Sequence, residues 1–248
     1  VAVEMIITVF MLLFSVNFAI YFLLLTKKWR EAVASDELRF FLAVVLGSTA
    51  ILTLVNSGVY ASLWESFRYT VFQIAAIIST TGFGTADFVL WPQFSQLILV
   101  LIMFCGACAG STGGGMKCSR VLLLLRALRR EVHRITHPRS VEVVKLDGKL
   151  VSESTLHTLL VFLGGYVVTV FAAALVISLD GQSFAVSFSA ALTCVSNVGP
   201  GLEAIGPSGN FAAFSGLSKA VMSLCMIVGR LEIFPILVLF SPSTWRRT

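Results

Sequence analysis

Long apolar stretches separated by short polar segments dominate the pattern along the chain. A helix of about 20 apolar residues crosses the roughly 30 Å hydrocarbon layer of a bilayer. Stretches near this length lie at residues 3–25, 38–57, 93–109, 155–179 and 211–240. The pattern therefore predicts about five membrane passes.

Two shorter apolar segments lie between these stretches, and each predicts a helix too short to span. They cover about 63–79 and 184–194, lengths that rise only about 16 to 24 Å. Such helices fit re-entrant segments, which enter and leave the membrane on the same face. The residues in position to cap them are Ser62 with Glu65, and Ser183 or Asp180.

Each short helix is followed by a glycine-containing run that does not continue as helix. The order of helix, short helix, glycine loop and helix occurs twice, with 117 residues from Gly82 to Gly199. We therefore predict an all-α integral membrane fold. It contains two repeats of helix, re-entrant pore helix with filter loop, and helix, preceded by one further transmembrane helix.

Both loops have the x-x-Gly-x-Gly spacing of a potassium-channel filter. Non-helical backbone at membrane depth is tolerated only where protein buries it or water reaches it, and a ring of carbonyls around a cation meets this condition. Glycine permits the dihedrals that turn successive carbonyls to one side, and the negative ends of the short helices favour cations. The expected filter residues are Thr80, Thr81, Gly82, Phe83, Asn197, Val198, Gly199 and Pro200, with K⁺ at Thr80, Thr81, Gly82, Asn197, Val198 and Gly199.

Composition and charge agree with a membrane protein and give its orientation. With 57% hydrophobic and 12% charged residues, the chain has too little polar surface for a water-soluble globule. Of its 18 basic residues, 15 lie in 27–39, 117–149 and 246–247, which are therefore expected to be cytoplasmic. The basic stretch 118–134 is expected to meet anionic lipid headgroups or a cytosolic partner.

Enzyme chemistry is disfavoured by the same sequence. Cys105 and Cys108 have redox or metal-site spacing, but no second ligand pair accompanies them. The glycine run before Lys117 differs from a phosphate-binding loop, since no Ser or Thr follows the lysine. No paired carboxylates or nucleophile arrangement lies near the glycine loops, and the three histidines are in or beside the basic segment. We expect no enzyme, no organic cofactor and no nucleic-acid partner.

A glycine-rich run interrupts the apolar stretch that begins near residue 93. Each glycine in a helix interior costs up to about 1 kcal/mol relative to alanine, so a continuous helix is disfavoured. A site of close helix packing is one interpretation.

Arg230 lies in the last apolar stretch, at a spacing from its filter glycine that matches the position of the glycine-rich run. It follows Gly199 by 31 residues, much as Thr112 follows Gly82 by 30, so both are expected at one depth. A charge at membrane depth is expensive and suggests function. A structural ion pair is the alternative, although Glu232 is a poor partner because helix positions two apart face different directions.

Several motifs together resemble the TrkH type of the Trk/Ktr/HKT superfamily of potassium transporters. They run through most of the chain: Ser79 to Phe83 followed by Trp91-Pro92, Gly110 to Lys117, Asn197 to Gly201, Gly229 to Glu232, and Trp245 to Arg247. The resemblance implies potassium transport through one pore lined by four repeats. For the glycine-rich run it implies a gate below the filter rather than a packing site, with Gly110, Ser111, Thr112, Gly113, Gly114, Gly115 and Arg230 as its residues. It also implies a homodimer in the bacterial inner membrane, with a cytosolic ring of nucleotide-binding regulatory subunits.

A ring of four loops is completed either by pairing two chains or by an upstream half of the same protein. The first stretch ends at a basic run and lacks signal-peptide features, so we expect the chain to begin inside a longer protein. The predicted units are 1–30, the closing helix of an upstream repeat; 37–134, the third repeat, with a broken second helix; 135–152, a cytoplasmic linker; and 153–248, the fourth repeat. A membrane scaffold without transport is the alternative from another functional class.

Overall fold

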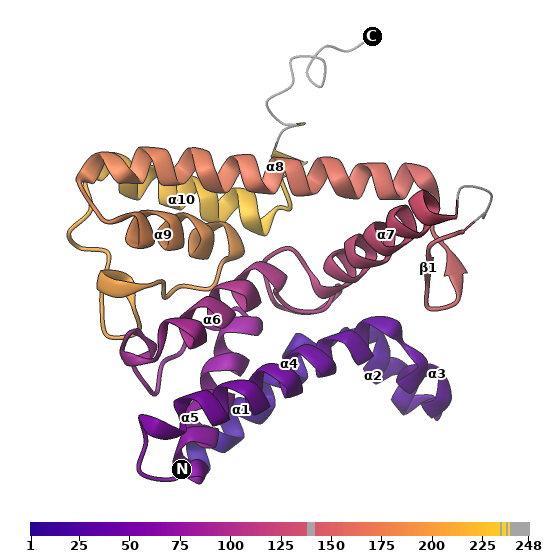
Figure 1. Ribbon diagram of the computed structural model, residues 1–248, viewed down its shortest axis with the longest axis horizontal. Coiled ribbons are helices and arrows are strands. Elements are labelled where there is room, and N and C mark those ends of the chain that lie inside the picture. The colour runs from indigo at the N-terminus through magenta and orange to yellow at the C-terminus, as the bar shows by residue number, and fades with distance from the viewer. Residues whose placement is uncertain (138–141, 234, 237, 239–248) are drawn as a thin grey trace.

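The computed structural model describes residues 1–137, 142–233, 235–236 and 238, and it is helical almost throughout (Figure 1). The helices are α1 (Ala2–Ser15), α2 (Phe18–Leu25), α3 (Trp29–Ala34), α4 (Asp36–Val55), α5 (Leu63–Ile78), α6 (Gln93–Cys105), α7 (Cys118–Thr136), α8 (Glu153–Ile177), α9 (Phe184–Ser196) and α10 (Gly216–Arg230). Two short strands, β1 (Lys145–Leu146) and β2 (Lys149–Leu150), pair antiparallel. This is the all-helical membrane architecture that the sequence predicts.

Two helices in the described part of the chain are long and apolar enough to span a membrane by themselves. They cover Asp36–Gly58 and Glu153–Asp180, which confirms the helices expected at 38–57 and 155–179. In the stretch 93–109, α6 stops at Cys105 and the backbone turns at Gly106 with φ of +68°, which confirms the break expected at the glycines. The stretch 211–240 is wrong at its start, because α10 begins only at Gly216; residues 234, 237, 239 and 240 lie outside the described part.

The predicted helix over 3–25 is broken, with an angle of 92° between α1 and α2. Val16 is extended at the break, and the Asn17 side chain accepts a hydrogen bond of 2.9 Å from the Ala19 amide at the start of α2. An asparagine that caps the following helix competes with a continuous helical backbone. Prediction of one continuous span was wrong for this reason.

The short helices α5 and α9 each pack against two or more other helices. Helix α9 packs against α8 and α10, while α5 packs against α4 and α1, and α6 joins the two groups (Figure 1). The last turns of both short helices are fully buried. One hydrophobic core runs through both groups, including Phe41, Ile77, Met103, Ile177 and Ala191. The re-entrant helices therefore end inside the protein.

Polar side chains start both short helices as expected. The Ser62 hydroxyl accepts from the Glu65 amide at 3.2 Å, although Glu65 accepts from the Ala61 amide rather than from Ser62. The Ser183 hydroxyl accepts from the Val186 amide at 3.2 Å, so Ser183 and not Asp180 is the cap of α9. Both caps support the predicted helix starts.

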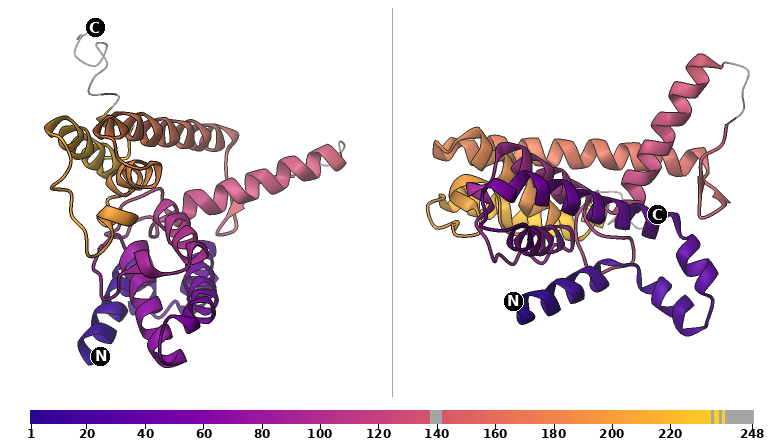
Figure 2. Two further views of the ribbon diagram at one scale, coloured as in Figure 1. Left: turned by 60° about the vertical axis from the view of Figure 1, so that its left-hand side comes forward. Right: turned by 60° about the horizontal axis from the view of Figure 1, so that its bottom comes forward.

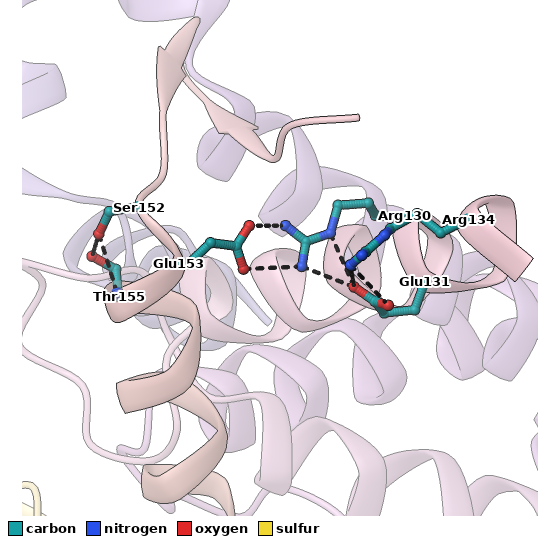
Figure 3. A network of polar contacts seen from close by, with 6 residues as sticks. All are labelled: Arg130, Glu131, Arg134, Ser152, Glu153 and Thr155. Carbon is teal, nitrogen blue, oxygen red and sulfur yellow. Dashed lines mark hydrogen bonds and ion pairs between the residues drawn. The ribbon is translucent and has the colours of Figure 1, made fainter. Parts of the chain in front are cut away.

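Helix α7 extends away from the packed helices in both views of Figure 2. Arg130 on α7 bonds Glu131 at 2.9 Å and Glu153, in the first turn of α8, at 3.2 Å (Figure 3). The Arg130 guanidinium holds the pKa of Glu131 below its usual range. The arginine side chain is buried against the two acids, so it links α7 to the start of α8.

Replacing Arg130 with alanine should loosen this link. The acids are exposed and such bridges contribute little, so amide exchange in the first turn of α8 should rise by up to about fivefold. Hydrogen–deuterium exchange of the whole transporter measures this effect. Arg129→Ala is the matched control, because Arg129 is the exposed neighbour. Equal exchange in the two variants would contradict the role of Arg130.

Candidate functional site

The first glycine loop leaves α5 through a tight turn. Thr80 and Gly82 have positive φ angles of +57° and +73°. The amides of Thr81 and Gly82 both donate to the Ala76 carbonyl, at 2.9 and 3.1 Å. These bonds satisfy carbonyl groups that the helix end would leave free, and they fix the loop to the end of α5.

The second glycine loop is fixed to α9 in a similar manner. Asn197 has φ of +58°, and the Val198 amide donates to the Thr193 carbonyl at 3.0 Å. The Gly199 amide then donates to the Thr193 hydroxyl at 2.8 Å. Just before the loop, the Ser196 hydroxyl pairs with the Tyr166 hydroxyl of α8 at 2.6 Å.

The two loops meet, although they are far apart in the sequence. A Cβ atom built on Gly82 would collide with the Val198 carbonyl oxygen and lie 3.1 Å from Pro200 Cδ. Gly199 has φ of +118°, which side chains rarely adopt, and its Cβ position is 4.0 Å from Gly82 Cα. The structure thus brings both sequence-predicted filter segments together at the ends of two buried half-helices.

The glycine-rich loop between α6 and α7 lies against the C-terminal ends of both α5 and α9. The Gly114 amide donates to the Thr80 hydroxyl at 2.8 Å. A Cβ on Gly113 would lie 3.3 Å from the Ser79 carbonyl, and one on Gly114 would lie 2.7 Å from the Ser196 carbonyl. Glycine is therefore required for this close approach. The middle of the loop is buried.

The outer part of the loop bonds to the break between α1 and α2. The Cys108 amide donates to the Ser15 carbonyl at 3.0 Å, and the Phe18 amide donates to the Gly110 carbonyl at 3.2 Å. Each of the two segments thus satisfies backbone groups that the break in the other segment's helix leaves without a partner. Sequence reasoning missed this part of the site; the signal available was the polar Asn17 within an apolar stretch.

Arg230 reaches the same loop from α10. Its Nη1 atom donates to the Thr112 carbonyl at 3.0 Å. The arginine borders a polar cavity of about 190 Å³ lined by Ser111, Gly113, Gly114, Gly115, Lys117, Gly229, Arg230 and Glu232. Lys117 in this cavity donates to the Gly113 carbonyl. The cavity thus carries positive charge directly beside the loop.

Glu232 pairs with Arg120 of α7 and not with Arg230. Among the described residues, no carboxylate forms an ion pair with Arg230. The packing at this end of α10 is close, because a Cβ on Gly229 would collide with the Val195 carbonyl at the end of α9. Helix α10 thereby places Arg230 next to both the loop and the filter region.

Glu37 of α4 is a site residue that the sequence analysis missed. Its Oε1 atom accepts hydrogen bonds from the amides of Ala109, at 2.6 Å, and Ser119, at 3.1 Å. The two donors lie on opposite sides of the glycine-rich loop. The signal available was an acidic residue at the start of an apolar span, since buried acids there are usually functional.

Backbone carbonyls are the groups in this site suited to a bare alkali cation. Within the described ranges, no three His, Cys, Asp or Glu side chains are grouped to hold a metal ion. Cys105 lies with its sulfur 3.6 Å from that of Cys118, and all five cysteines are free thiols. Potassium would pass through such a site as cargo, in contact with the carbonyls of the two glycine loops.

The chain is similar to known cation transport proteins over nearly its whole length. The TrkH family, described as cation transport protein, matches residues 1–247. The Trk system potassium uptake protein TrkH of Salmonella typhimurium is 34% identical over 98% of this chain and 51% of its own length. TrkG of Escherichia coli K12 is 32% identical over 98% of this chain and 50% of its own.

A solved structure resembles the fold along nearly the whole chain. The potassium transporter TrkH from Vibrio parahaemolyticus matches with a TM-score of 0.88 and 31% identity, covering 99% of this chain and 53% of that one. The chain therefore spans about half the length of the relatives it matches. These matches are to transport proteins and not to enzymes, and the chain belongs to the TrkH family of cation transport proteins.

Proposed function

We propose that this chain supplies two of the four repeats that line a potassium pore in the bacterial inner membrane. The observation that carries the proposal is the meeting of two glycine loops at the ends of buried half-helices. The carbonyls of residues 80–82 and 197–199 would replace part of the water around K⁺. The helix ends behind them present partial negative charge, which stabilises a cation at this point.

The loop containing Gly110 to Gly115, together with Arg230, forms the gate of this pore. Gly114 bonds the filter residue Thr80, and Arg230 bonds Thr112. These contacts support a loop that crosses the end of the filter, on the side where the positive charges of Lys117 and Arg230 lie. A close-packed structural element has the same glycine content, and the experiments below distinguish the two roles.

The other assembly assignments follow from the family. An upstream half of the same protein supplies the remaining two repeats, since the chain covers about half the length of its relatives. The transporter is a homodimer, with lipid around its apolar faces. A cytosolic ring of nucleotide-binding regulatory subunits acts on it through the basic helix α7, which extends from the body.

Measurement of ion flux distinguishes a pore from a membrane scaffold that does not transport ions. The whole transporter, purified and placed in liposomes, is expected to carry ⁸⁶Rb⁺ and K⁺ down a gradient and to admit Na⁺ less readily. A folded protein that carries neither ⁸⁶Rb⁺ nor K⁺, even when its cytosolic partner is present, would contradict the proposed function.

Deleting Gly113 to Gly115 should raise K⁺ flux and make it less dependent on the cytosolic partner. These residues make the closest approach to both pore helices, so their loss shortens the obstruction and removes the bond to Thr80. Rubidium uptake per folded transporter, with and without the partner, measures the change. If flux falls while the protein stays folded, the loop is a packing element.

A further inference from the structure

Glu37 is a buried carboxylate whose role the filter and the gate leave unexplained. It lies in the first turn of α4 and is only 6% exposed. Within the described residues it has no cationic partner in an ion pair. Burying a charge costs several kcal/mol unless hydrogen bonds compensate for the lost water. Its two backbone donors, Ala109 and Ser119, provide that compensation.

Both donors belong to the ends of the glycine-rich loop. Ala109 lies on the limb that leaves α6, and Ser119 is the second residue of α7. The two limbs also touch directly, since the Cys118 amide donates to the Ala107 carbonyl at 2.9 Å. Glu37 therefore holds the two limbs of the loop together where they meet, whereas Arg230 bonds Thr112 between the limbs.

The carboxylate also completes the start of α7. The residue before that helix, Lys117, makes no side-chain capping bond. The first amides of a helix need an acceptor, and a negative charge there is favoured by the helix dipole. Glu37 supplies both from the neighbouring helix. A hydrogen bond to a carboxylate is also roughly twice as strong as one between neutral groups.

We propose that Glu37 is a positioning residue that holds the loop in its closed arrangement by joining both limbs, and the start of α7, to α4. This inference rests on the gate proposed above. Helix α7 extends away from the packed helices, toward the region assigned to the cytoplasm (Figure 2), so a displacement of this helix along its axis reaches Ser119 at its start. Moving Ser119 away from Glu37 breaks the contact that holds the two limbs together and lets the loop leave the filter.

The decisive variant is Glu37→Gln, which keeps the volume and an acceptor oxygen but removes the charge. In single-channel recordings of the whole transporter, the open probability should rise about tenfold, the factor expected when a charged hydrogen bond becomes neutral. Unit conductance and the K⁺/Na⁺ ratio should stay unchanged, because Glu37 touches neither filter loop. Glu31→Gln is the matched control, since Glu31 lies on α3 and is exposed.

A double-mutant cycle identifies the path of the effect. When Gly113 to Gly115 are deleted, Glu37→Gln should change open probability no further, because coupled residues show non-additive effects. Additive effects would overturn the proposal. If the deletion alone raises flux and Glu37→Gln does not, the gate stands and the role of Glu37 is wrong.

Amide exchange tests the hydrogen bonds of Glu37 to the loop independently of ion flux. In Glu37→Gln, exchange at Ala109 and Ser119 should accelerate by about tenfold, while exchange in α9 stays as in the parent. Unchanged protection at both amides would overturn the proposal whatever the flux. If protection falls but loop deletion fails to raise flux, the contact is real, and both the gate and the part of the proposal that rests on it are wrong.

Discussion

Replacing Gly82 with serine should lower the K⁺/Na⁺ permeability ratio of the pore by about tenfold or more. Two effects act together at this position. The φ angle of +73° costs a side-chain residue roughly 1 to 2 kcal/mol, and a tenfold change corresponds to 1.4 kcal/mol. The new Cβ would also collide with the Val198 carbonyl oxygen. One substitution thus displaces carbonyls in both glycine loops of this chain.

Gly199→Ser separates strain from collision. At φ of +118° its side chain is strained, but its nearest neighbour, Gly82 Cα, is at an ordinary 4.0 Å. We therefore expect a loss of K⁺ preference in the same direction and of smaller size. Bi-ionic reversal potentials of the whole transporter in planar bilayers measure both variants.

The matched control for these two variants is Gly164→Ser. Gly164 lies on α8 with nothing within 4 Å of a built Cβ, so the same chemical change meets open space there. Its permeability ratio should equal that of the parent. If all three variants kept the parent ratio while folding normally, neither glycine loop would be a filter.

The sequence was most informative where local chemistry and an internal repeat agree. Ser62 and Ser183 begin the two short helices as capping chemistry requires, and the glycine loops follow where those helices stop. Both patterns depend on residues a few positions apart. Their repetition 117 residues later also predicted that the two loops would be equivalent parts of one site.

The break after Ser15 depends on contacts that no local pattern contains. A run of apolar side chains predicts one helix, and a single Asn17 does not outweigh that pattern. The break persists because the Cys108 amide and the Gly110 carbonyl satisfy its free backbone groups. Those partners lie about 90 residues farther along the chain. Ala109 likewise lies 72 residues from Glu37, so a local sequence pattern predicts neither contact.

Replacing Arg230 with alanine should raise K⁺ flux by roughly tenfold. A fixed positive charge 4 Å from a cation repels it by about 4 kcal/mol at an effective dielectric of 20, and water in the cavity reduces this value. The variant also loses the hydrogen bond from Nη1 to the Thr112 carbonyl. Removing the barrier and freeing the loop both favour conduction.

Arg230→Lys tells the two causes apart, because it keeps the charge and loses the planar set of donors. A lysine that conducts like the parent indicates that charge dominates. One that conducts like alanine indicates that the bond to Thr112 dominates. Lys219→Ala is the control for charge on the same helix, since Lys219 lies in the first turn and bonds the Ala212 carbonyl.

A purely structural role for Arg230 makes the opposite prediction. If the arginine neutralised a buried acid, alanine would strand that charge and cost about 3 to 5 kcal/mol, so the protein would leave the membrane or unfold. Glu232, the acid nearest in sequence, instead pairs with Arg120 and keeps its partner in the variant. We therefore expect Arg230→Ala to fold normally. Rubidium uptake per folded transporter decides the matter: an alanine variant that folds normally yet conducts no faster than the parent would rule out Arg230 as part of the gate.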